Sequence, residues 1–96
     1  MEFILDTGYN GWLTLPQDII SRLGLTIRVE RTVSLADGRS VTLRTFAATV
    51  LWHGQPNNVY VVESESEPLL GLSMLWGSKL TLEAQDGGEV TIEEMT

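Results

Sequence analysis

The chain has 96 residues and a net charge of −7, with 43% apolar residues and no cysteine. A chain of this length and composition suits one small globular domain, residues 1–96, rather than a disordered segment. Its acidity and its six scattered Lys and Arg residues argue against a nucleic-acid partner, and no apolar run is long enough for a membrane span. Without cysteines or an evident signal peptide, we expect a cytoplasmic protein without disulfides.

The first quarter of the chain predicts two short strands and one helix. Residues 2–6 form an apolar run that predicts a buried strand, and residues 12–15 alternate briefly as a second one. Pro16 suits the first turn of a helix, and Gly24 is a natural residue just past a helix end. Apolar residues at helical spacing between them predict a helix over residues 16–23.

A long hairpin is predicted next. Residues 26–35 alternate as an extended strand, and Asp37-Gly38 favours a tight turn because such a turn needs positive φ. The return strand covers residues 40–52. Its apolar positions are odd before Thr45 and even after it, which predicts a bulge or a change of environment at that point.

The second half of the chain predicts further short strands separated by turns. Residues 53–58 predict a turn, followed by a strand over residues 59–62 and a solvated acidic loop over residues 63–67. Residues 79–84 and 89–93 alternate cleanly and predict a terminal hairpin. Four apolar residues are expected on its inward face: Leu80, Leu82, Val90 and Ile92. Many short strands with one or two short helices predict an all-β sheet that closes on itself.

Asp6 stands where the first apolar strand ends. A carboxylate there costs several kcal/mol of desolvation unless hydrogen bonds hold it. Thr7 offers a hydroxyl group, and Gly8 allows backbone amides to approach closely. The pattern is typical of a positioned acid. The only histidine, His53, lies in a turn without metal-ligand spacing, so we expect neither a metal nor another cofactor.

Asp6-Thr7-Gly8 after an apolar strand resembles the active-site motif of aspartic proteases. Its continuation to Pro16 is similar to the small prokaryotic, single-motif branch of the retropepsin-like family (clan AA). Two more segments follow in the family's order, a candidate flap at Ala36-Asp37-Gly38 and a candidate cleft-bracketing element at Leu69-Leu70-Gly71. The resemblance implies a retropepsin-like closed β-barrel and an aspartic-type endopeptidase, a hydrolase of peptide or protein substrates.

The chemistry of this family requires two carboxylates that share one proton, one activating a water and the other acting as the acid. The chain carries only one Asp-Thr-Gly, because Asp18 lies in the predicted helix and Asp37 and Asp86 lie in predicted turns. The resemblance therefore implies a homodimer in which the two copies of Asp6 meet across a twofold axis. Thr7 would brace the two loops, and Gly8 would lie against the water.

Family members have a further strand before the catalytic one, whereas Asp6 is only the sixth residue here. We therefore expect a barrel without its usual N-terminal strand and with an exposed sheet edge. Two alternatives stay open on the same barrel: a non-catalytic peptide-binding module and an inactive truncated relative. An intact Asp6 and Thr7 favour the enzyme, since a binding module has little need of a buried carboxylate.

Overall fold

The computed structural model describes residues 1–95, which form eight strands and two short helices. In chain order these are β1 (Ile4–Asp6), β2 (Leu13–Leu15), α1 (Gln17–Leu23), β3 (Thr26–Ser34), β4 (Ser40–Trp52), β5 (Gln55–Glu63), β6 (Leu69–Gly71), α2 (Leu72–Leu75), β7 (Ser78–Leu82) and β8 (Val90–Glu94). Strands make up 53% and helices 12% of the structure, which confirms a mostly β chain.

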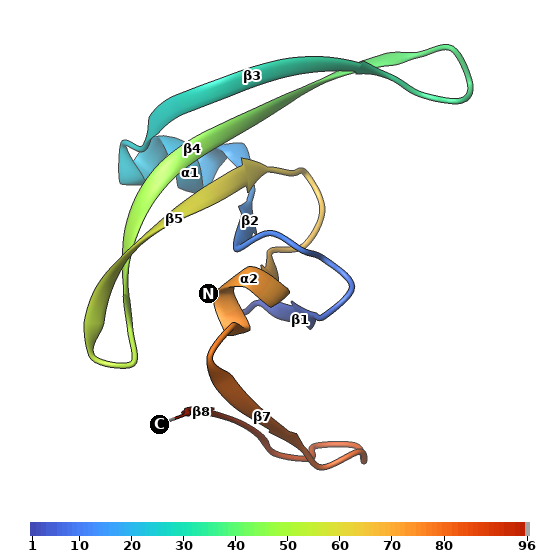
Figure 1. Cartoon of the computed structure of the whole chain (residues 1–96). Coiled ribbons are helices and arrows are strands. Elements are labelled where there is room, and N and C mark those ends of the chain that lie inside the picture. Colours follow the sequence, from blue (N-terminus) through green and yellow to red (C-terminus); the bar gives the residue numbers. More distant parts are fainter. Residues whose placement is uncertain (96) are drawn as a thin grey trace.

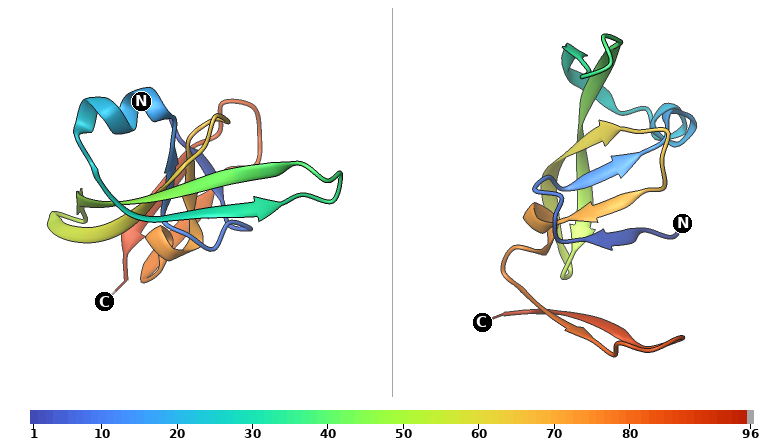
Figure 2. Two further views of the ribbon diagram at one scale, coloured as in Figure 1. Left: turned by 90° about the horizontal axis from the view of Figure 1, so that it is seen from above. Right: turned by 90° about the vertical axis from the view of Figure 1, so that its right-hand side faces the viewer.

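Six strands form one sheet in the order β1-β6-β2-β5-β4-β3, and β7 and β8 pair separately as a hairpin (Figure 1). The six-stranded sheet is open, because β1 and β3 lie at its two ends and do not pair with each other. The closed barrel predicted from the sequence is therefore not formed by residues 1–95 of one chain. The terminal hairpin stands apart from the sheet in Figure 1 and in the right-hand view of Figure 2.

Helix α1 matches the prediction closely. Pro16 precedes it in an extended conformation, and Gly24 ends it with φ 64°, where its N–H reaches the carbonyl groups of Ile20 and Ser21. A left-handed residue at this position satisfies carbonyl groups that the helix itself leaves free. Both helices are short, and no helix within residues 1–95 has the length and apolar character needed to cross a membrane.

Strand β4 passes through two environments, as the change of phase near Thr45 predicts. Val41 and Leu43 face the side of the sheet away from the core and are 36% and 40% exposed. The bulge itself lies on the partner strand, because the register between β3 and β4 shifts between Ile27 and Val29. The remaining apolar residues of β4 pack against the core: Phe46, Ala48, Val50 and Trp52.

The turn between β4 and β5 is shorter than the sequence predicts. His53 and Gly54 turn the chain with φ values of 53° and 75°, and β5 begins at Gln55 instead of residue 59. Pro56 is tolerated in the strand because β5 pairs with β2 only from Val61 onward, so its outer side is free there.

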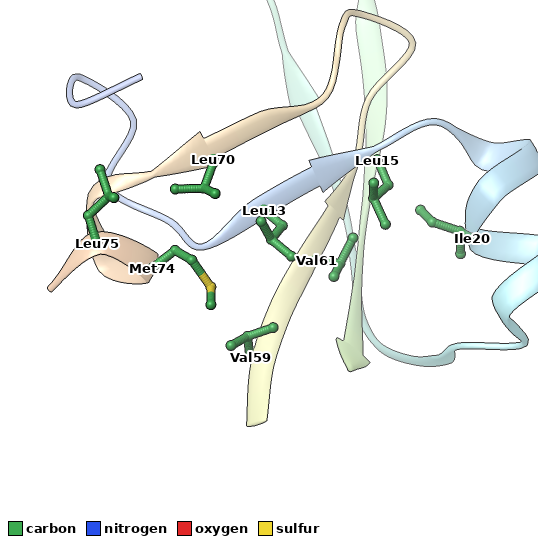
Figure 3. Close-up of a cluster of buried hydrophobic side chains, with 8 residues drawn as sticks. All are labelled: Leu13, Leu15, Ile20, Val59, Val61, Leu70, Met74 and Leu75. Carbon is green, nitrogen blue, oxygen red and sulfur yellow. The ribbon is translucent and has the colours of Figure 1, made fainter. Parts of the chain in front are cut away.

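The core is a single row of buried side chains between α1 and α2 (Figure 3). Val61 at its centre is fully buried. The prediction of a buried strand holds for one face of β1 only, since Leu5 packs against the core while Ile4 is 47% exposed. The row comprises Leu13, Leu15, Ile20, Val59, Val61, Leu70, Met74 and Leu75.

The terminal hairpin has the predicted pairing but little core of its own. Leu80 lies opposite Ile92, and Leu82 lies opposite Val90. Only Ile92 packs against the core, whereas Leu82 is 65% exposed. The predicted inward face is thus largely open in one chain, because the hairpin extends past the end of the sheet and has no layer to pack on.

Candidate functional site

Asp6 ends β1 directly opposite Gly71, the last residue of β6. The two strands are parallel, so the segments that follow them leave the sheet at the same edge. Leu69 and Leu70 pair with Ile4 and Leu5 in the same register. The structure therefore brings together the predicted catalytic segment and the predicted cleft-bracketing element, which are far apart in the sequence.

The carboxylate of Asp6 is held by the turn that follows it. The side-chain Oδ1 accepts a hydrogen bond of 2.9 Å from the Gly8 N–H. The backbone carbonyl oxygen of Asp6 accepts one of 3.1 Å from the Tyr9 N–H. A Cβ atom at Gly8 would lie 3.2 Å from the same Oδ1, so glycine leaves room for this contact. Asp6 is half-buried, and Thr7 beside it is exposed. The acid is oriented, yet solvent can reach it.

The loop that follows Asp6 is pinned by the segment that follows β6. Four consecutive carbonyl groups, those of residues 9–12, each accept a hydrogen bond from residues 71–73. The backbone N–H of Gly71 donates to Trp12 at 2.8 Å, that of Leu72 to Tyr9 at 2.7 Å and that of Ser73 to Gly11 at 3.1 Å. The Ser73 hydroxyl donates to the Asn10 carbonyl group. The first N–H groups of α2, which the helix leaves free, thus fix the loop.

Sequence reasoning overlooked Ser73 and Tyr9. The Tyr9 ring folds back over Gly11, where a side chain would overlap it, and a Cβ atom at Gly71 would lie 2.6 Å from Tyr9 Cδ2. Burial raises the pKa of the Tyr9 phenol above its ordinary value of 10.0. The two glycines flanking the ring are the sequence signal, because each leaves the space that the ring fills.

Thr14 fixes β6 from the other side. It is a buried polar residue on β2, and its hydroxyl oxygen accepts a hydrogen bond of 2.8 Å from the Leu69 N–H. A buried hydroxyl without a partner would be costly, so this bond sets the position where β6 begins. The register of Gly71 opposite Asp6 depends on that starting point.

The candidate flap is the tip of the β3–β4 hairpin. Gly38 takes φ 87°, and the Arg39 side chain is 2.6 Å from the Asp37 carboxylate. Ala36, Asp37 and Gly38 are all exposed. The tip projects beyond the sheet, and β3 lies at the opposite end of the strand order from β1 (Figures 1 and 2). Within one chain, the tip and Asp6 therefore occupy different ends of the sheet.

An apolar hollow of about 480 Å³ lies next to the Asp-Thr-Gly turn. Thr7 lines it together with Leu72, Trp76, Leu80 and Met95, so it joins the turn, α2 and the terminal hairpin. Trp76 is 80% exposed, which is unusual for the largest apolar side chain. Large exposed apolar patches are typical of interaction sites, so this surface is a candidate for one. We call this region the Trp76 surface.

Among residues 1–95, no three His, Asp or Glu side chains lie together as metal ligands. The Nε2 atom of His53 lies 2.7 Å from the Ser78 hydroxyl and so ties the β4–β5 turn to the start of β7. No family model matches the sequence, and no significant match is found among curated proteins or solved structures.

Proposed function

We propose that the chain is one subunit of a homodimeric aspartic peptidase with a retropepsin-like active site. The observation that carries the proposal is the pairing of Asp6 with Gly71, at a turn where the Gly8 N–H orients the carboxylate. The neighbouring loop has four consecutive carbonyl groups held by the last residue of β6 and the first two residues of α2.

The chemistry follows from two such carboxylates in contact. They hold one proton between them, because two adjacent like charges repel strongly. The ionised carboxylate takes a proton from water as the water oxygen attacks the peptide carbonyl carbon, and the protonated carboxyl gives its proton to the carbonyl oxygen. The carboxyl that took up the water proton then gives it to the amine nitrogen as the C–N bond breaks, while the other carboxylate takes a proton from one hydroxyl group of the tetrahedral intermediate. The pair again holds one proton.

A second copy of the chain would supply the second carboxylate. Thr7, adjacent to Asp6, lines the Trp76 surface, so a partner packed there would bring its own turn close to Asp6. A twofold interface uses the same patch on both copies, which suits a chain with a single Asp-Thr-Gly. Trp is enriched among the residues that dominate interface energy. The closed, barrel-like cleft would then be completed by both chains.

The test compares peptide turnover by the wild type and by Asp6→Asn on a library of unstructured peptides. Asp6→Asn should retain its fold by circular dichroism and its dimer by sedimentation, yet lose all measurable turnover. Asp18→Asn is the matched control, because Asp18 is an exposed carboxylate in the first turn of α1. Wild-type turnover per chain should also fall on dilution below the dimer Kd. Full turnover by Asp6→Asn, or by a monomer, would contradict the proposal.

A second candidate is a peptide-binding module that does not cleave. It is favoured by a groove of about 580 Å³ on the β3–β4–β5 face, a volume typical of ligand sites. Peptide binding by the wild type that is unchanged in Asp6→Asn, without cleavage by either, would support this alternative.

A further inference from the structure

The groove on the β3–β4–β5 face has an apolar floor and two arginines. It is lined by Val29, Leu43, Tyr60 and Val62, with Arg28 and Arg31 beside them. Residues directly opposite each other in neighbouring strands share a face of the sheet. Val29 pairs with Thr45, which pairs with Val62, and Arg31 pairs with Leu43. The register therefore places this apolar row and Arg31 on one face; we call it the arginine groove.

The carboxylates of strands β3 and β5, Glu30 and Glu63, are engaged on the other face. Arg44 lies 3.1 Å from Glu63 and 3.8 Å from Glu30, so these three side chains form an ion network. Within residues 1–95, no carboxylate lies within ion-pair distance of Arg28 or Arg31. The chain has 13 carboxylates and six cations, so this lack of pairing does not follow from composition. The groove presents two guanidinium groups that are free to bind an anion.

An aromatic contact links the groove to a second hollow beside the Asp-Thr-Gly loop. Tyr60 lines the floor of the groove, and the Tyr60 ring packs edge-on against Trp12 with ring centres 5.5 Å apart. Trp12 in turn lines a hollow of about 400 Å³ together with Asn10 and Ser73, the pair that pins the loop. An extended chain lying in the groove can therefore run on past Trp12 to the loop that follows Asp6.

We propose that the arginine groove binds extended peptide segments in which an acidic side chain lies among apolar ones. This specificity rests on the proposed function, since the same chain would cleave the bound peptide. Guanidinium groups bind carboxylates by charge-assisted hydrogen bonds, and the apolar floor suits neighbouring aliphatic side chains. The net charge of −7 does not oppose this, because charges more than about 8 Å away are largely screened at physiological salt.

Binding can be tested without cleavage by using Asp6→Asn as the background. Three fluorescein-labelled peptides of equal length share the same Leu and Val residues and carry Glu, Gln or Lys at one position between them. Fluorescence anisotropy should give an affinity for the Glu peptide about tenfold above that for the Lys peptide, and the difference should shrink as salt is added. Arg31→Glu should abolish or reverse this preference. Arg22→Glu makes the same change of net charge on α1, outside the groove, and should leave the preference intact.

The possible outcomes distinguish a failure of the proposed acidic-peptide specificity from a failure of the proposed peptidase activity. Equal affinity for the three peptides, or an acidic preference that survives Arg31→Glu, would overturn the specificity. Cleavage of the Glu and Lys peptides at equal rates by the wild type would also overturn it while leaving the peptidase in place. Binding of the Glu peptide without wild-type cleavage would support the groove and contradict the peptidase. A dimer weakened by Arg31→Glu but not by Arg22→Glu would mean that a second copy fills the groove, and would overturn the specificity.

Discussion

Gly71 lies directly opposite Asp6. Because Gly71 has no side chain, the loop that follows Asp6 can pass close to its Cα atom. A Cβ atom there would lie 2.8 Å from the Tyr9 carbonyl oxygen and would also overlap the Gly11 carbonyl. The neighbours are backbone atoms held by hydrogen bonds, so they cannot move aside without losing those bonds. The catalytic candidate and the bracketing segment thus form one unit.

Gly71→Ala should therefore destabilise the fold by about 3 kcal/mol, the upper end for an overpacked site. Gly38→Ala is the matched control, since a Cβ atom at Gly38 meets no neighbour within 4 Å. The only cost of this substitution is that of alanine at a φ of 87°, about 1 kcal/mol. Urea unfolding of the wild type and the two variants measures both losses of stability. Equal losses of stability would mean that the contact around Gly71 is looser than the structure has it.

The candidate flap predicts an effect on turnover without a matching effect on folding. Gly38→Val and Gly54→Val both place a β-branched residue at positive φ in an open turn, with φ values of 87° and 75°. Each should cost about 1–2 kcal/mol of stability. Only Gly38→Val should reduce peptide turnover beyond the loss expected from stability, because in the proposed dimer the tip would act as a flap whose movement governs access to the cleft. Similar turnover in the two variants would show that the β3–β4 tip is a structural turn.

Much of the local structure could be predicted because short-range chemistry decides it. Pro16 and Gly24 delimit α1, and Asp37-Gly38 sets the β3–β4 turn, each through backbone preferences of one or two residues. The phase change near Thr45 is visible in the sequence because the apolar residues of β4 lie first on the open side of the sheet and then on the core side. The bulge itself lies on β3, and its position could not be predicted because it depends on how β3 pairs with β4, which local sequence does not determine.

The candidate site could be predicted only in part, for the same reason. Asp6 and Gly71 were identified from their motifs, but the hydrogen bonds from Leu72 and Ser73 to the loop depend on β6 entering between β1 and β2. Alternation in the terminal hairpin predicted an inward face, yet periodicity does not reveal whether anything covers that face. In one chain Leu82 is 65% exposed, so the face that the alternation predicts is largely uncovered.

Tyr9→Phe tests the burial of the phenol next to the site through pH. Because burial raises the pKa of Tyr9, the folded chain holds this proton more tightly than the unfolded chain. The stability linked to it is fully present below about pH 10 and is lost as the pH rises through the folded-state value. The free energy of unfolding should therefore fall less steeply above about pH 10 in Tyr9→Phe than in the wild type. Parallel curves for the two proteins would indicate that the Tyr9 phenol is solvated in the folded chain.

Trp76→Ala tests the surface on which the proposed dimer depends. Trp76 is 80% exposed, so its removal should change the unfolding of an isolated chain by less than about 0.5 kcal/mol. As a central interface residue it should instead weaken the dimer by about 2 kcal/mol, close to thirtyfold in Kd. Leu51→Ala is the matched control, because Leu51 is 75% exposed on β4 and lies outside the Trp76 surface. Sedimentation velocity over a range of concentrations gives both dimer constants.

The same pair of variants links the interface to the active site. If two copies of Asp6 act together, turnover by Trp76→Ala at low protein concentration should fall with the dimer fraction and recover as the concentration is raised. Leu51→Ala should follow the wild-type concentration curve. A Trp76→Ala chain that dimerises normally would move the interface to another face of the molecule. One that becomes monomeric yet keeps its turnover would show that a single Asp6 suffices, and a second carboxylate would then have to come from within the chain.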